Sequence, residues 1–154
     1  MTIESHPADL ASQRAAGWID PRGQRFAAAL TTVILAVALL FQNPWVLLFQ
    51  AVVFAAAVVL GPSRGPFGWI FRLLIKPRIS PPHELEDPRP PRFAQLVGLI
   101  FAVLGLVGFF TGTWVLGLAA TGCAVVAALL NALIGFCLGC ELYLLGRRVL
   151  PSRS

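Results

Sequence analysis

The sequence predicts an all-α integral membrane protein with four transmembrane helices. Three observations lead to this fold class. Hydrophobic residues make up 57% of the chain and charged residues only 12%, about half the charged share of a soluble domain. The apolar residues gather in two runs without any charge, residues 26–61 and 93–140. All 12 Lys and Arg residues lie outside these runs, so a lipid bilayer is the natural solvent for both.

The first apolar run is too long for one membrane-spanning helix. Residues 26–61 would form a helix of roughly 54 Å, against a hydrocarbon core of about 30 Å. Asn43-Pro44 falls near the middle of the run, and this dipeptide favours a turn. We therefore expect a helical hairpin with spans at residues 26–41 and 45–60, both extending into their flanks.

The second apolar run divides in the same way. Thr111-Gly112-Thr113 interrupts it, which predicts spans at residues 93–110 and 114–136. Trp45 and Trp114 open the second helix of each predicted hairpin. Tryptophan is enriched where a helix meets the membrane surface, so we expect both indole rings at the outer interface.

The basic residues predict the orientation. Three precede the first hairpin, six lie between the hairpins and three follow the second, whereas the two tight loops have none. By the positive-inside rule both termini and the central linker should be cytoplasmic, in a multi-pass membrane protein. The net charge of +5 is then juxtamembrane and suits anionic lipid headgroups rather than nucleic acid.

An internal repeat relates the two hairpins. Residues 20–27 (DPRGQRFA) match residues 87–94 (DPRPPRFA) at six of eight positions. Trp45-Val46-Leu47 recurs as Trp114-Val115-Leu116. We interpret the pattern as a tandem duplication, and because both copies start on the same side, a pseudo-two-fold axis should run along the membrane normal.

The repeat organises the chain into five segments. They are a cytoplasmic N-terminal tail (1–19), a first hairpin unit (20–78), a proline-rich cytoplasmic linker (79–86), a second hairpin unit (87–150) and a short tail (151–154). Each unit should end in a short amphipathic cytoplasmic segment, at residues 67–75 in the first. Residues 79–91 are rich in proline and are expected to be extended, without regular structure.

The repeated Asp-Pro-Arg-x-x-Arg motif has two interpretations. In one, Asp caps the following helix, Pro occupies its first position, and the arginines contact lipid phosphates. In the other, the arginines form a paired anion site. Either interpretation assigns lipid or anion contact to Arg22, Arg25, Arg89 and Arg92.

Cys137 and Cys140 are the strongest candidate functional residues. Two cysteines three residues apart, near a cytoplasmic membrane boundary, can close a disulfide, hold a persulfide or supply two ligands to a soft metal. The alternative is that two small residues pack at a helix contact beside Gly135 and Gly139. Two cysteines do not fill a zinc site alone; His83 and Glu141 could complete one only if the linker folds back, and we assign no metal ligands. Cys123, in the middle of a span, is expected to pack.

The local backbone should decide how reactive the pair is. An unbroken helix past Cys140 would place both thiols near its negative end and disfavour the thiolate. If Gly135 or Gly139 breaks the helix, a new helix starting near Cys137 would favour the thiolate. Glu141 is the nearest proton acceptor, and it joins Cys137 and Cys140 as a candidate catalytic residue.

These motifs resemble a known bacterial membrane family. The segments Asp20-Pro21-Arg22 with Arg25-Phe26-Ala27, residues 84–94 (ELEDPRPPRFA) and residues 130–141 (LNALIGFCLGCE) are similar to the family called domain of unknown function 4395. The resemblance runs over residues 17–148, and it implies that the membrane is a bacterial inner membrane. It implies no activity, but members of the family are often linked to thioredoxin-like and rhodanese-like proteins, which implies thiol or sulfur handling.

The leading hypothesis is therefore thiol–disulfide or sulfane-sulfur exchange through Cys137 and Cys140, with a thioredoxin-like or rhodanese-like cytoplasmic partner. One alternative is a non-catalytic accessory or scaffold subunit of a membrane complex. Another is a small transporter, for which the spans lack buried charge. No motif points to a quinone, haem or flavin, so no cofactor is expected. The sequence leaves open whether the chain is an enzyme and whether it forms a homo- or hetero-oligomer.

Overall fold

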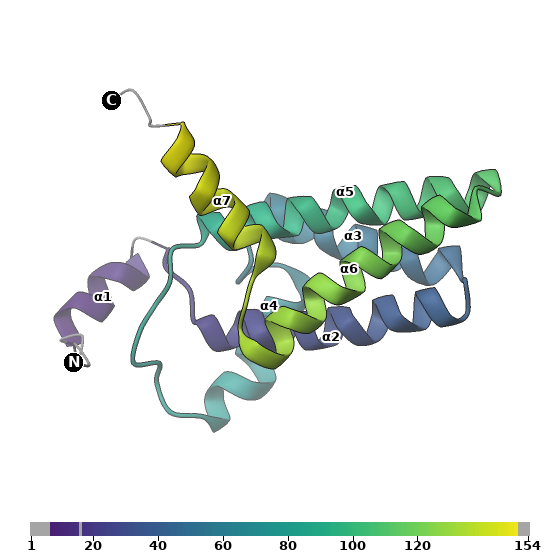
Figure 1. Cartoon of the computed structure of the whole chain (residues 1–154). Coiled ribbons are helices and arrows are strands. Elements are labelled where there is room, and N and C mark those ends of the chain that lie inside the picture. The colour runs from purple at the N-terminus through teal and green to yellow at the C-terminus, as the bar shows by residue number, and fades with distance from the viewer. Residues whose placement is uncertain (1–6, 16, 151–154) are drawn as a thin grey trace.

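The structure is a computed structural model, and it describes residues 7–15 and 17–150 as an assembly of helices (Figure 1). The α-helices among these residues are α1 (Pro7–Ala15), α2 (Pro21–Leu40), α3 (Pro44–Leu60), α4 (Pro66–Ile70), α5 (Arg89–Thr111), α6 (Trp114–Ile134) and α7 (Leu138–Val149). A π-helical turn, η1 (Phe71–Ile75), and a 3-10 turn, η2 (Lys76–Arg78), follow α4. The predicted all-helical class is confirmed for the described residues.

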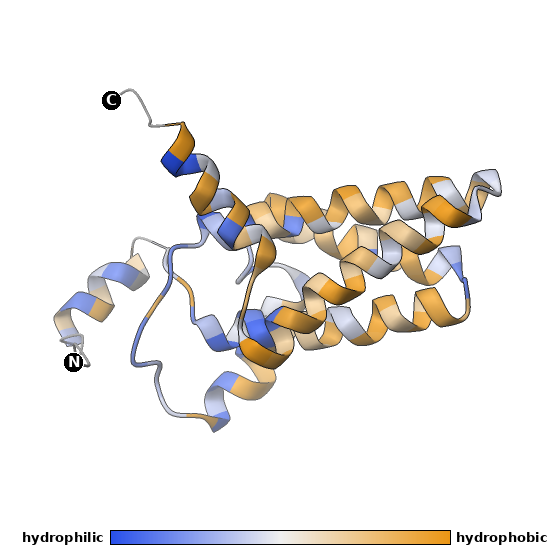
Figure 2. Ribbon diagram, viewed as in Figure 1, coloured by the Kyte–Doolittle hydropathy of each residue, from blue (hydrophilic) through white to orange (hydrophobic). Residues whose placement is uncertain are grey.

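Three of these helices, α2, α5 and α6, are long and apolar enough to cross a membrane. Helix α3 is equally apolar but has 17 residues, the lower end of the usual range for a span. Apolar residues cover all four, and hydrophilic residues gather at the ends of the bundle (Figure 2). These helices indicate a membrane protein, as the hydropathy of the sequence predicted.

Asp and Pro residues fix where the helices begin. Asp20 caps α2 by accepting a hydrogen bond from Arg22 N, and Asn43 caps α3 in the same way. Helix α5 begins at Arg89, earlier than the predicted span at 93. Pro90 and Pro91 are compatible with its first turn. Backbone N–H groups in the first turn of a helix have no partner within the helix, so a proline, which has no N–H, loses no hydrogen bond there. The expectation that residues 79–91 lack regular structure is therefore wrong for 89–91.

The two tight turns of the bundle lie at one end, and α1, α4, α7 and the 79–88 linker lie at the other (Figure 1). Helix α2 makes its most extensive contacts with α6, and α3 makes its most extensive contacts with α5. The first helix of each repeat thus packs on the second helix of the other repeat. The two repeats are interleaved rather than placed side by side.

Apolar side chains and close glycine contacts hold the four bundle helices together. A Cβ atom on Gly108 of α5 would collide with the backbone of Gly117 in α6, so the two helices approach as only small residues allow. Gln50, fully buried, donates a hydrogen bond of 3.3 Å to Thr31 Oγ1. The buried apolar cluster consists of Leu35, Ala38, Leu47, Ala51, Phe54, Ala102, Phe109 and Ala124.

Each repeat ends in an amphipathic segment that docks on the first helix of its own repeat. The ring of Phe71, in η1, lies 5.8 Å from that of Phe26 in α2. Tyr143, in α7, lies 5.7 Å from Phe93 in α5. Phe26 and Phe93 are aligned residues of the repeated motif. The amphipathic segment expected at 67–75 comprises most of α4 and the π-helical turn η1, and the 3-10 turn η2 follows it.

Candidate functional site

The cysteine pair lies at the junction between α6 and α7. Gly135 ends α6 in the left-handed conformation (φ 71°), and its N–H donates to Asn131 O. Two residues later Cys137 is the N-cap of α7, with its Sγ accepting a 3.2 Å hydrogen bond from Cys140 N. The helix is therefore broken at Gly135, which is the second of the two predicted alternatives. The predicted fourth span, drawn to residue 136, ends at Ile134 instead.

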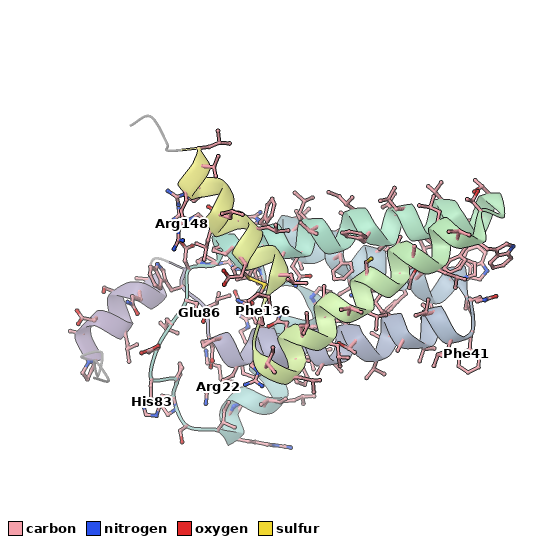
Figure 3. The ribbon with its side chains drawn as sticks, viewed as in Figure 1. Arg22, Phe41, His83, Glu86, Phe136 and Arg148 are labelled. Carbon is pink, nitrogen blue, oxygen red and sulfur yellow. A yellow bond between two sulfur atoms is a disulfide. The ribbon has the colours of Figure 1, made fainter. Side chains whose placement is uncertain are left out.

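Cys137 and Cys140 are joined by a disulfide, with their Cα atoms 5.2 Å apart. The sulfur–sulfur bond is drawn in yellow at the start of α7 (Figure 3). Both cysteines are partly buried. In the reduced pair, the first turn of α7 would direct its N–H groups and its positive end at Cys137, and this favours the thiolate over the thiol.

Helix α7 is held in place by a tight contact with α5. A Cβ atom on Gly139 would lie 2.6 Å from both Cα and Cβ of Ala94, so a glycine is needed for the helices to touch at this point. Because Gly139 stands between the two cysteines, this contact also fixes the position of the disulfide relative to α5.

A polar cavity of about 360 Å³ borders the disulfide on one side. Both cysteines line it together with three acidic residues and Arg25; the acidic residues are Glu86 and Asp87 of the linker and Glu141 of α7. Glu141 is exposed, and its N–H donates to Cys137 O over 3.0 Å. The cavity therefore brings together all three candidate catalytic residues at the end of the bundle that carries the linker.

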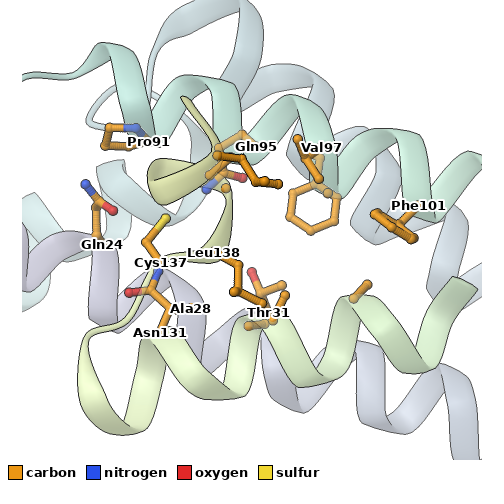
Figure 4. Close-up of a pocket in the computed structure, with 18 of the residues that line it drawn as sticks. Gln24, Ala28, Thr31, Pro91, Gln95, Val97, Phe101, Asn131, Cys137 and Leu138 are labelled. Carbon is orange, nitrogen blue, oxygen red and sulfur yellow. The ribbon is translucent and has the colours of Figure 1, made fainter. Parts of the chain in front are cut away.

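A second, mainly apolar cavity of about 320 Å³ borders Cys137 (Figure 4). Cys137 lines both cavities, whereas Cys140 and Glu141 line only the polar one. Gln24 and Asn131 also line both. The amide nitrogen of Gln24 is buried and has no hydrogen-bond partner among the described residues. Cys123, which forms no disulfide, lines the apolar cavity and is exposed, so the expectation that it packs is not met.

The repeated arginines have specific protein contacts. The guanidinium group of Arg22 forms an ion pair with the Asp20 carboxylate, and that of Arg89 forms an ion pair with the Asp87 carboxylate. Arg25, of the first repeat, donates to Ala132 O and Leu133 O at the end of α6, over 3.2 and 3.0 Å.

Arg92, of the second repeat, makes the equivalent contact with the first repeat. It donates to Val58 O and, over 2.9 Å, to Val59 O at the end of α3. Each repeat thus caps the last helix of the other. The predicted cap at Asp20 is present, whereas the N-cap of α5 is Pro88, and Asp87, one residue earlier, accepts a 2.9 Å hydrogen bond from Arg89 N. Lipid or anion contact by the four arginines stays a prediction.

Two linker carboxylates at the polar cavity have shifted pKa values. Although much of Glu86 is exposed, partial burial of its carboxyl group, with Glu84 and Asp20 nearby, raises its pKa. Hydrogen bonds from the Arg89 side chain lower the pKa of Asp87. The rim of the polar cavity therefore holds one carboxylate that favours protonation and one that favours ionisation.

Sequence reasoning missed Gln24 and Gln95 as lining residues of the apolar cavity. Gln24 stands inside the repeated motif and Gln95 directly follows the second copy, a signal that could have drawn attention to both. No local pattern indicated that α7 would fold back on α5 and close the cavity. Among residues 7–15 and 17–150, no group of three or more His, Cys, Asp or Glu side chains is placed to hold a metal ion.

Comparison with known proteins gives one family. A model of the family described as "Domain of unknown function (DUF4395)" matches residues 19–148, which is most of the chain. A search of curated proteins gave no match, and neither did a search of solved structures. The fold and the site are therefore interpreted from the structure itself.

Proposed function

Because the chain belongs to the family called domain of unknown function 4395, whose activity is not defined, its function has to be inferred from the site, and we propose that Cys137 and Cys140 exchange disulfides with a partner protein. The observation that carries this proposal is the position of Cys137 as the N-cap of α7. A pair in which one sulfur faces the N-terminus of a helix is suited to alternate between thiolate and disulfide.

The two cysteines would have different roles. A partner thiolate entering the polar cavity attacks Sγ of Cys140, forming a mixed disulfide and breaking the Cys137–Cys140 bond. Cys137 leaves as a thiolate, which the N–H of Cys140 and the positive end of α7 stabilise. A more stable thiolate is a better leaving group. A second partner thiolate then attacks the partner sulfur of the mixed disulfide and releases reduced Cys140, leaving an oxidised partner.

In this proposal all four bundle helices cross a bacterial inner membrane as two hairpins, with both termini and the linker cytoplasmic. The one-sided distribution of basic residues supports it, as does the position of α1, α7 and the linker at the same end of the bundle (Figure 1). The partner would then be a cytoplasmic thioredoxin-like protein, or a rhodanese-like protein that carries sulfane sulfur.

Mass labelling of the cysteines in intact membranes tests the proposal. Membranes are alkylated with a light reagent, reduced, alkylated with a heavy reagent and digested. We expect Cys137 and Cys140 to carry the heavy label, and to carry the light label when a dithiol reductant is added first. A pair that stays light without reductant, or heavy after it, would remove the exchange role and leave a structural accessory subunit as the function.

A further inference from the structure

The apolar cavity has the location of a site for a lipid-soluble molecule. It lies between α2, α5, α6 and α7, with Phe54 of α3 also at its wall. Three of these helices are the long apolar ones. Both repeats contribute to its lining at aligned positions. Ala28 aligns with Gln95 and Thr31 aligns with Gly98, and all four residues line the cavity. Its volume of about 320 Å³ falls within the roughly 300–1,000 Å³ typical of small-molecule sites.

Polar groups are confined to few positions in this cavity. Cys137, Gln24 and Asn131 lie toward one end of it, Phe101 lies toward the other, and Gln95 and Thr31 lie between them (Figure 4). The buried Gln24 amide nitrogen donates to no described residue. A buried donor without a partner is unusual, because leaving it unpaired costs about 1–3 kcal/mol. A ligand that offers a carbonyl oxygen next to Cys137 would satisfy it.

The chemistry of the pair narrows the ligand class further. If Cys137 and Cys140 oxidise a partner dithiol, they end reduced, and an acceptor of two electrons and two protons must restore the disulfide. We propose that the apolar cavity binds the ring of a lipid-soluble quinone, which is that acceptor. This inference rests on the proposed thiol exchange. A quinone has an apolar ring, a carbonyl at each end for an amide donor, and a tail that is soluble in the bilayer.

The step balances as follows. The Cys137 thiolate, which lines the cavity, adds to a ring carbon and forms a carbon–sulfur bond. The Cys140 thiolate then attacks Sγ of Cys137, so that the disulfide forms and the carbon–sulfur bond breaks. Its electron pair stays on the ring. The dithiol has lost two electrons and two protons, and the quinone has gained both as a hydroquinone. Glu141, on the polar cavity with Cys140, accepts the proton that Cys140 gives up and passes it to water. Two protons from water reach the oxygens of the reduced ring, which replaces the two protons that the thiols released.

The test uses the full chain, purified and reconstituted in lipid nanodiscs. The reduced protein is mixed with decylubiquinone, a ubiquinone with a short saturated tail, and hydroquinone and disulfide are quantified together. In parallel, an azido-ubiquinone is photo-crosslinked and its attachment site is mapped by mass spectrometry. Cys137→Ser and Cys140→Ser remove the thiols. Ala128→Phe fills the cavity that Ala128 lines, and Val126→Phe, on the same helix but 56% exposed, is its matched control.

We expect one hydroquinone per disulfide, with no turnover in either serine variant. Ala128→Phe should lose at least ten-fold in both turnover and crosslinking while retaining the helical circular dichroism of the wild type, and Val126→Phe should behave as wild type. Crosslinks in the serine variants would persist, because binding needs no thiol. If the thiols exchange with a reduced thioredoxin but decylubiquinone neither oxidises them nor blocks the crosslink, the quinone site is refuted and the cavity holds acyl chains. A chain that binds the quinone but exchanges no thiols would instead refute the proposed function.

Discussion

Ile19 and Glu86 exchange two backbone hydrogen bonds, of 2.9 and 2.8 Å, as an isolated antiparallel bridge. The two residues are 67 positions apart, and each directly precedes an Asp-Pro-Arg motif. A residue that pairs with its own counterpart in this way lies next to a local two-fold axis. The reciprocal caps made by Arg25 and Arg92 follow the same two-fold relationship, because each arginine binds the helix end of the other repeat. Together these contacts support the tandem duplication that the sequence predicted.

The reciprocal caps predict a shared loss of stability. Arg25→Ala removes the cap of α6 and Arg92→Ala removes that of α3, so each should destabilise the protein by about 1 kcal/mol. Thermal unfolding followed by tryptophan fluorescence in detergent measures the change. Arg64→Ala is the control, because Arg64 is exposed and makes no hydrogen bond or ion pair with other described residues. Equal unfolding temperatures for Arg25→Ala and Arg64→Ala would contradict the cap.

The proposed membrane topology predicts which loops are accessible from outside the cell. Single cysteines at Phe41 and Thr113, in a chain without its native cysteines, should react with an impermeant maleimide added to intact cells. These positions avoid the capping side chain of Asn43 and the left-handed backbone of Gly112. A cysteine at Ser80, in the linker, should react only after permeabilisation. The reverse pattern of labelling would overturn the proposed orientation.

The cysteine pair predicts a selective loss of activity. Replacing both Cys137 and Cys140 with Ser should abolish disulfide exchange with a reduced thioredoxin. The fold should survive, because serine is itself a favourable N-cap. Cys123→Ala should leave the exchange unchanged, since Cys123 is unpaired. Exchange is measured by gel shift after maleimide labelling. Full exchange by the double variant would show that the pair has no catalytic role.

The contact between α7 and α5 predicts opposite effects at two glycines of one helix. Gly139→Ala places a Cβ atom against Ala94, and overpacking of this kind costs about 1–3 kcal/mol. Gly146→Ala meets nothing within 4 Å and should stabilise α7 by about 0.5–1 kcal/mol through helix propensity. The unfolding temperature should therefore fall in the first variant and rise in the second. A rise in both would mean that α7 is not held against α5.

The shifted carboxylates predict a pH-dependent effect at the polar cavity. The pKa of Glu86 is raised mainly by burial, so its contribution to stability is full below the unfolded pKa of about 4.3 and is lost as pH rises through the folded value. Glu86→Gln mimics the protonated form and should raise the unfolding temperature at pH 7 but not at pH 4. Asp87→Asn should lower the unfolding temperature at pH 7, because Arg89 lowers the pKa of Asp87 and stabilises its ionised form. Identical pH profiles for the two variants would contradict this assignment.

The four apolar segments could be predicted because each is a continuous stretch of side chains with one preferred solvent. The starts of α2 and α3 followed from Asp20-Pro21 and Asn43-Pro44, which carry their signals locally. The start of α7 could only be reduced to two alternatives, because Gly135 is compatible with a helix and with a left-handed turn. The pairing of α2 with α6, and the cavities beside Cys137, depend on contacts between residues far apart in the chain. Periodicity and composition do not encode those contacts.

The reciprocal arginines also bear on the origin of the chain. A single repeat, expressed alone, would present an arginine with no carbonyls to bind and a helix end with no arginine to cap it. Two copies of that repeat would satisfy both needs by assembling with each other. A one-hairpin ancestor could therefore have completed its fold only as a homodimer, and joining its genes would have freed one copy to change independently. The cysteine pair, present in the second repeat and absent from the first, is the kind of asymmetry that such a fusion permits.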